Sequence, residues 1–353
     1  MTRSSMSRAL SPRACAYALL LIGLVVAPWA GLYPVLGTKI LCYALFACAF
    51  HLLLGYTGLA SLGHAAFLGV GGYLAGYGVK AWALPPELAL LAGLGAGAAL
   101  GLVVGFVSIR RSGIYFTMIT LALAQMVYFL CVQIPQTGGE DGLQGIDRGR
   151  LFGVLDLHDD LTMYYTVLVI SMVCFLFIAR VVHSPFGQAL QAIKDNEPRA
   201  ISLGYHPPRY KLIVFTLSAA LTGLAGALKA ISLGFVTLSD VHWMTSGHAL
   251  LMTLVGGMGV LSGPVVGALA LVMLENKIGE LGVLIAGATG LTWFNTLGES
   301  VMMVMGIVFV VCVLAFRRGI MGEVVALQRR RRGTASCHSS SHSASSVSEE
   351  PQP

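Results

Sequence analysis

The chain has 353 residues and a formal net charge of +6, and 56% of its residues are hydrophobic whereas only 11% are charged. Soluble domains carry about 25% charged residues, so this sequence has too few charges to cover the surface of a water-soluble particle. The composition therefore excludes an ordinary soluble protein. It predicts an all-α, polytopic integral membrane protein, a helical bundle that lipid surrounds.

The chain is predicted to have three regions. Residues 1–15 form a basic cytoplasmic N-terminal segment, residues 16–322 form a transmembrane domain, and the Ser-rich residues 323–353 form a disordered cytoplasmic tail. The first apolar run resembles a secretory signal, but no convincing cleavage site follows it before the next apolar run. We therefore interpret it as a retained first span.

Apolar segments of spanning length recur along the transmembrane region. A helix that crosses a bilayer needs about 20 mostly apolar residues. About ten segments, with a range of eight to ten, meet this need: 16–34, 38–54, 59–79, 88–108, 114–134, 162–182, 210–231, 249–274, 279–295 and 299–316. Most basic residues fall in the segments that lie inside if the N-terminus is cytoplasmic, so both termini are predicted to be cytoplasmic.

The acidic residues lie in loops, at the ends of predicted spans or in the tail, and none lies near the middle of a span. Proton and sodium relays place carboxylates at membrane depth. This distribution argues against an ion-coupled carrier or a channel and indicates an uncharged pathway whose energy comes from elsewhere. A stand-alone secondary carrier is the alternative from a different class.

A segment at 55–64 places polar and flexible residues just before the third apolar run. A Gly-rich helix start exposes N–H groups with a partial positive charge, which can receive a substrate carboxylate. The alternative is a capped helix start whose histidine packs against a neighbour, and the segment taken alone favours it. An intramembrane enzyme is disfavoured because no carboxylate lies at that depth to orient a histidine base. The pathway candidates here are Gly55, Tyr56, Gly58, Ser61, Gly63 and His64.

Glycines recur every four residues in two of the predicted spans. This spacing lines one helical face with hydrogen, so that a neighbouring backbone can approach closely. The first stripe is Gly93, Gly97, Gly101 and Gly105, and the second is Gly259, Gly263 and Gly267. A proline beside the second stripe frees a backbone carbonyl, so residues 256–267 are predicted to form a broken or re-entrant helix. The pathway candidates there are Gly256, Gly257, Gly263 and Pro264.

The loop at 183–211 is predicted to form two short amphipathic helices outside the bilayer. Ala189, Leu190 and Ile193 form an apolar stripe on the first helix. Asp195 or Asn196 can cap the second helix, Pro198 fits its first turn, and Leu203 with Gly204 can end it. Such helices need a surface to pack on, which is either the membrane or a cytoplasmic partner.

The sequence lacks two features that a self-sufficient transporter would need. It contains no Gly-x-x-x-x-Gly-Lys-Ser/Thr motif, so it has no usual cradle for ATP. The outer loop at 135–161 is too short to be a substrate-binding domain. The seven cysteines show no metal-ligand spacing and are interpreted as small hydrophobic residues. We expect a transport subunit without its own ATPase site, cofactor or metal.

Several blocks together resemble the branched-chain amino acid ABC transporter permease family, in particular its Liv-type M subunits. The resemblance covers residues 38–322 in the family's order. Its blocks are 55–67, 187–203, 218–228 and 256–267, with an outer-loop segment of Thr137, Gly138, Gly139, Gly142, Leu143, Gly145 and Ile146. Two positions depart from the family pattern. Leu59 stands where members often have Gln, and Glu197 lies one position earlier than the Glu of the Glu-Ala-Ala…Gly pattern of many ABC importers.

The resemblance implies an importer for branched-chain amino acids or a similar small solute in a bacterial inner membrane. Close relatives of the family handle urea, short amides or aromatic acids, and sugar permeases are more distant. The implied partners are ABC ATPase subunits that bind ATP, a second permease subunit, a periplasmic solute-binding protein and membrane lipid, but no nucleic acid. The resemblance also assigns coupling to the ATPase to Gly187, Lys194, Asp195, Asn196, Glu197 and Gly204.

Overall fold

The structure is a computed structural model that describes residues 23–29, 31, 33–153, 155–289, 306–307, 310, 319 and 321–322. The predicted N-terminal segment, the predicted tail and nearly all of the tenth span lie outside these residues, and the first and ninth spans lie only partly within them. The chain divides into two compact units, Met1–Leu250 and Leu251–Pro353, which are described separately.

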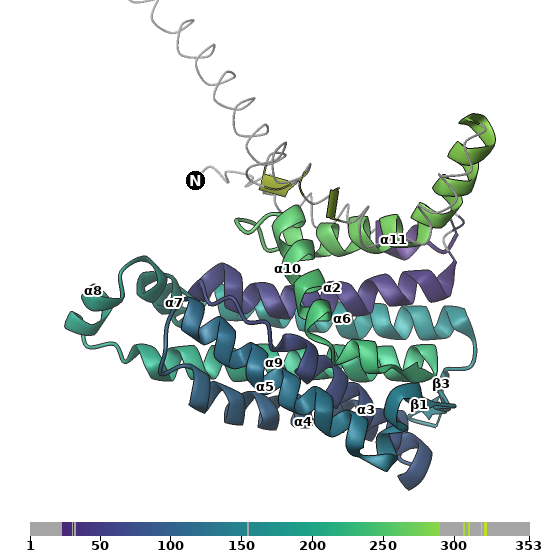
Figure 1. Ribbon diagram of the computed structural model, residues 1–353, viewed down its shortest axis with the longest axis horizontal. Helices are drawn as coiled ribbons and strands as arrows, with labels where there is room; N and C mark the ends of the chain where they lie inside the picture. The colour runs from purple at the N-terminus through teal and green to yellow at the C-terminus, as the bar shows by residue number, and fades with distance from the viewer. Residues whose placement is uncertain are drawn as a thin grey trace, which may run out of the picture. The chain divides into compact units, whose positions relative to one another are not determined.

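Six long helices lie in the described part of the first unit. They are α2 (Pro34–Thr57), α3 (His64–Trp82), α4 (Pro86–Ser108), α5 (Ile114–Gln133), α6 (Asp160–Val182) and α9 (Pro207–Leu233). Two short helices, α7 (Pro185–Asp195) and α8 (Glu197–Ser202), lie at one end of this bundle, and the strands β1 (Leu143–Gln144) and β3 (Leu155–Asp156) lie at the other (Figure 1). We call these the inner end and the outer end, after the sidedness predicted from charge.

Among the described residues, five helices are long and apolar enough to cross a membrane, namely α2, α4, α5, α6 and α9. They correspond to five of the predicted spans, and they agree with a multi-pass membrane protein. Most of α2 and α9 is buried, whereas α4, α5 and α6 expose most of their surface. The two buried helices therefore form the centre of the unit, and the apolar surface of the other three is the part suited to lipid.

The first glycine stripe lets a neighbouring backbone approach closely, as predicted, and the neighbour is α9. A Cβ placed on Gly97 would lie 2.5 Å from the carbonyl oxygen of Ala219, and one on Gly93 would lie 2.5 Å from the Cβ of Ala227. On α3, a Cβ on Gly71 would collide with the backbone of Gly223 in α9. Lipid gives no hydrophobic drive for helix association, so this backbone contact is what holds α3, α4 and α9 together.

The third predicted span is wrong at its start, because residues 59–63 are not helical. Helix α2 ends at Thr57, and Gly58 follows it with a left-handed φ of 72°. Such a residue ends a helix without strain only when it has no Cβ. The chain then runs irregularly to His64, where α3 begins.

Short strands stabilise the outer end of an otherwise helical unit. The outer loop contains the 3₁₀ turns η1 (Pro135–Thr137) and η2 (Gly139–Asp141) and the strands β1 (Leu143–Gln144), β2 (Arg150–Leu151) and β3 (Leu155–Asp156). Strand β1 pairs antiparallel with β4 (Phe235–Val236), with Leu143 opposite Val236, and β2 pairs with β3. The all-α prediction is therefore correct for the bundle and misses these two small sheets.

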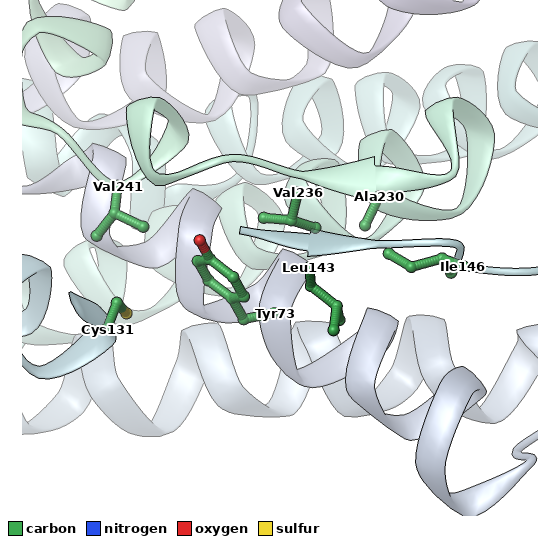
Figure 2. Close-up of a cluster of buried hydrophobic side chains, with 7 residues drawn as sticks. All are labelled: Tyr73, Cys131, Leu143, Ile146, Ala230, Val236 and Val241. Carbon is green, nitrogen blue, oxygen red and sulfur yellow. The ribbon is translucent and has the colours of Figure 1, made fainter. Parts of the chain in front are cut away.

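A buried apolar cluster fixes the outer loop to the middle of α3 and to the last turns of α5 and α9 (Figure 2). Leu143 and Ile146 of the loop lie in this cluster beside Tyr73 of α3. Gly142 has a φ of 72°, and a Cβ there would collide with the carbonyl oxygen of Val236. The glycines and apolar residues of the outer-loop segment therefore have a structural explanation. The whole cluster is Tyr73, Cys131, Leu143, Ile146, Ala230, Val236 and Val241.

The predicted eighth span, 249–274, is wrong as a single helix. Helix α10 (Trp243–Gly256) ends there, residues 257–262 form a turn, and α11 (Gly263–Thr289) follows and continues into the predicted ninth span. The predicted break within 256–267 is therefore confirmed. Pro264 lies in the first turn of α11, where a missing N–H costs nothing. Gly256 and Gly263 approach so closely that a Cβ on either would collide with the other's backbone.

Candidate functional site

The two short helices of the 183–211 loop form where the sequence predicts them. Helix α7 (Pro185–Asp195) begins after Ser184, whose Oγ accepts a hydrogen bond from the N–H of Gly187 at 3.4 Å. Helix α8 (Glu197–Ser202) is capped by Asn196, whose side-chain oxygen accepts from the N–H of Arg199 at 3.0 Å. Gly204 has a φ of 88°, which suits the end of the helical segment.

Helix α7 lies with one face against the bundle. Ala189, Leu190 and Ile193 are the buried apolar residues of that face, as the stripe predicts, and α7 contacts α2, α6 and α9. A Cβ on Gly187 would collide with the carbonyl oxygen of Val182, so this glycine lets α7 begin directly beside the end of α6. The loop is therefore packed onto three helices of the bundle.

Two lysine contacts join this loop to different helices. The Nζ of Lys194, in the last turn of α7, donates to the carbonyl oxygen of Gly55 in α2 at 2.7 Å. The Nζ of Lys211, in α9, donates to both carboxylate oxygens of Glu197 at 2.8 Å. Asp195 lies between the two contacts and is exposed. The predicted coupling residues thus gather at one place, and two of them connect it to the bundle.

The far side of the loop exposes large apolar side chains. Ile201 is 57% exposed and Leu203 is 68% exposed, and Tyr205 beyond them is also exposed. They are interleaved with the exposed polar residues Ser202 and His206. The ring of Tyr205 also meets that of Tyr210, in the first turn of α9, edge-on at 5.8 Å, so this surface lies beside the start of that helix.

The 55–64 segment is enclosed by neighbouring elements. A Cβ on Gly55 would lie 2.6 Å from the ring of His51, and a Cβ on Gly63 would lie 2.8 Å from the carbonyl oxygen of Thr120. The ring of Tyr56 meets that of His51 edge-on at 5.6 Å. Ser61 is fully buried, and its Oγ accepts from the N–H of Gly63 at 3.3 Å.

His64 forms part of a buried hydrogen-bond chain. Its Nε2 lies 2.9 Å from the Oγ of Ser218, and that hydroxyl donates to the carbonyl oxygen of Ala49 at 2.5 Å. Because the serine has only one hydrogen, the Nε2 of His64 must carry the proton that it donates to Ser218. The rings of Phe50, Phe67 and Phe215 surround the imidazole edge-on at 5.1 to 5.8 Å.

The N-cap residue of α3, Gly63, has no side-chain cap hydrogen bond, but a first-turn N–H of the helix is bonded to another helix. The N–H of Ala65 donates to the Oγ of Ser246 in α10 at 2.7 Å, so a protein hydroxyl already occupies this first-turn donor. His64 packs against its neighbours, as in the alternative interpretation of the sequence. The assignment of the 55–64 segment to a translocation pathway stays a prediction.

The outer end contains a buried ion pair that sequence reasoning missed. Lys229 of α9 is 8% exposed and pairs with Asp240, which is 6% exposed and ends the turn η3 (Leu238–Asp240). The Nζ of Lys229 also donates to the hydroxyl of Tyr43 in α2 at 3.2 Å. The sequence does contain a signal for this pair, since Asp240 is the single acidic residue between the apolar runs 210–231 and 249–274.

A second lysine of the outer end is exposed. Lys80 donates from its Nζ to the carbonyl oxygen of Gln144 at 2.8 Å, and both residues line an open hollow of about 320 Å³. Within the part of the chain that the structure describes, no group of three or more His, Cys, Asp or Glu side chains could hold a metal ion.

Comparison with known proteins gives one family. The family described as "Branched-chain amino acid transport system / permease component" matches residues 35–313. The high-affinity branched-chain amino acid transport system permease protein LivM of Escherichia coli strain K12 is 29% identical over 283 residues, and that of Salmonella typhimurium strain LT2 is 30% identical. Each alignment covers 71% of this chain and 65% of the relative.

A more distant relative belongs to a sugar transporter. The ribose import permease protein RbsC of Escherichia coli strain K12 is 26% identical over 202 residues, which is 56% of this chain and 62% of that protein. No solved structure matches the chain.

Proposed function

Because the chain belongs to the family of branched-chain amino acid transport permease components, we propose that it is the membrane permease subunit of an ABC importer. In this role it translocates branched-chain amino acids or a similar small solute into the cell. A separate ATPase subunit binds and hydrolyses ATP. A second permease subunit and a periplasmic solute-binding protein complete the transporter in the inner membrane of a bacterium.

The observation that carries the proposal is the α7–α8 loop at the inner end. It is packed onto three helices of the bundle on one side, and it presents Ile201, Leu203 and Tyr205 on the other. Exposed apolar residues on a polar loop are typical of a protein docking surface. In our proposal the ATPase subunit covers this surface, and its movement reaches the bundle through α7.

The cargo is proposed from the relatives and from charge. The LivM proteins of Escherichia coli and Salmonella typhimurium align over more of this chain than the ribose permease of Escherichia coli does. The buried carboxylate among the described residues, Asp240, is paired with Lys229, which argues against a free acid for proton or sodium coupling. This supports an ATP-driven importer over a secondary carrier. Urea, short amides and aromatic acids are the alternative cargoes.

The translocation pathway is proposed to include two glycine-rich segments. The first is residues 55–64, where α2 ends and the chain is irregular before α3 begins. The second is the turn between α10 and α11, with Gly256, Gly257, Gly263 and Pro264. Interrupted helices at membrane depth occur where the backbone is buried in protein or lines a cavity, which supports both assignments.

The test begins with purification of the tagged chain in mild detergent and mass spectrometry of the proteins that accompany it. We expect an ATPase, a second permease and a binding protein, and ATP-dependent uptake of radiolabelled leucine by the reconstituted complex. Gly204→Pro should abolish uptake without preventing membrane insertion, because a left-handed φ is closed to proline. Purification of the chain alone, together with leucine uptake that needs no ATP, would contradict the proposal.

A further inference from the structure

We propose that Lys194 is a positioning residue, which transmits movement of α7 to the last turn of α2 together with Gly58, at residues 55–58. The inference rests on the proposed function and adds a residue-level route from the docking loop into the bundle. It assigns to Lys194 a role in coupling ATP hydrolysis to solute movement, without contact to either ATP or solute.

Lys194 contacts the turn at two points. Its Nζ donates to the carbonyl oxygen of Gly55 at 2.7 Å, and its aliphatic stem lies over Gly58, where a Cβ would be 3.5 Å from its Cγ. The Gly55 carbonyl is among the last of α2, which have no partner within their own helix. A cation is favoured at this negative end of a helix. The contact therefore joins a charge on α7 to the point where α2 stops.

The turn is suited to respond because it is a break in the chain between two long helices. Gly58 has a left-handed φ of 72°, and residues 58–63 follow without helical structure. A displacement at Gly55 is therefore taken up by a permissive glycine and a short irregular segment. It does not have to bend a continuous helix.

Other helices contact the same segment and would receive its movement. Thr117 of α5 donates from its Oγ1 to the carbonyl oxygen of Ala60 at 2.8 Å. Just after the segment, the N–H of Ala65 in α3 donates to the Oγ of Ser246 in α10. The segment thus connects α7 on one side to α5 and α10 on the other, and α10 leads to the proposed pathway turn at 257–262.

The second contact of the loop, between Glu197 and Lys211, joins it to a different helix. Glu197 joins α8 to α9 through Lys211, so it fixes the loop to a central, mostly buried helix. Lys194 joins α7 to α2 at an exposed position, and its flexible side chain can follow a moving partner. We infer that the Glu197 contact holds the loop in place and that the Lys194 contact carries its movement.

The test compares Lys194→Met, which keeps the apolar stem but removes the charge, with Lys194→Arg, which keeps both. In the reconstituted complex we expect Lys194→Met to retain ATP hydrolysis but to lower uptake per ATP about tenfold, from the loss of one charged hydrogen bond. Lys194→Arg should retain most of the wild-type uptake per ATP. The matched control is Lys80→Met, which removes the same kind of Nζ contact to a backbone oxygen at the outer end and should leave uptake per ATP unchanged.

Hydrogen exchange of residues 58–63, with and without a non-hydrolysable ATP analogue, separates transmission from a merely structural role. We expect the analogue to change exchange in the wild type and in Lys194→Arg but not in Lys194→Met. A response that persists in Lys194→Met, or that is absent from the wild type, would overturn the inference. Absence of ATP-dependent uptake by the wild type would instead contradict the proposed function.

Discussion

Helix α9 carries one lysine–carboxylate pair near each of its ends, and the two pairs differ in their access to water. At the outer end, the side chains of Lys229 and Asp240 are 10% and 8% exposed. At the inner end, Lys211 is equally buried, but its partner Glu197 is 41% exposed. A buried pair cannot exchange its partner for water, whereas a half-exposed one can. The outer pair is therefore a closure that water does not reach, whereas water reaches the inner pair, which holds the loop to α9.

The largest effect is expected from breaking the outer pair. Lys229→Met leaves the carboxylate of Asp240 buried without a counterion, and removal of one partner of a buried pair costs about 3 to 5 kcal/mol. We expect a large fall in the unfolding temperature of the detergent-solubilised protein, measured by a thermal shift assay.

A double variant decides whether charge or shape matters at this position. Lys229→Met combined with Asp240→Leu removes both charges and leaves apolar side chains, which is often neutral for stability. We expect the double variant to recover most of the stability that the single variant loses. If the double variant is as unstable as Lys229→Met, the closure depends on polar contacts of Lys229 such as that with Tyr43.

A smaller effect is expected from the inner pair. Lys211→Met leaves Glu197 close enough to water to be hydrated, and half-exposed pairs contribute about 0.2 to 1 kcal/mol. The same thermal shift assay should show a small decrease, and added salt should reduce the difference from the wild type because it screens exposed charges. A loss as large as that of Lys229→Met would remove the distinction between the two ends.

The smallest effect concerns the exposed surface of the outer loop. The pKa of His158 is raised above its ordinary value of 6.5, first by its hydrogen bond to Asp156 and then by that to Asp147. A group whose pKa is raised on folding stabilises the fold below its unfolded pKa, and this stabilisation is lost as pH rises through the folded pKa. We expect hydrogen exchange of residues 147–160, corrected for the intrinsic pH dependence of exchange, to be faster above that pKa than at pH 6. His158→Gln should remove the difference.

Local signals in the sequence were sufficient for the elements that depend on neighbouring residues. The sequence was enough to predict the cap at Asn196, the first-turn Pro198 and the helix end at Gly204, because a helix end is decided within a few residues. The stripe from Gly93 to Gly105 was legible for the same reason, since its spacing marks one face whatever helix covers it. The break at 257–262 could be predicted from its glycines and Pro264. The residues at which the helices on either side begin and end could not be predicted.

Contacts between distant segments could not be predicted in this way. His64 meets Ser218, and Lys194 meets Gly55, more than a hundred residues apart in each case. Periodicity states which face of a helix is apolar and does not state which helix will cover it. The third span was predicted to begin at Leu59 because residues 59–63 are mostly apolar. In the structure Gly58 ends α2, and the chain does not return to a helix until His64.

The pairing of Lys229 with Asp240 also bears on how the chain enters the membrane during synthesis. An unpaired charge is costly to insert into a membrane, and Lys229 lies four residues before the end of the apolar helix α9. Here the counterion is only eleven residues further along, so it leaves the ribosome directly after the lysine. The two charges can meet as α9 is released into the bilayer, and no later part of the chain is needed to neutralise them.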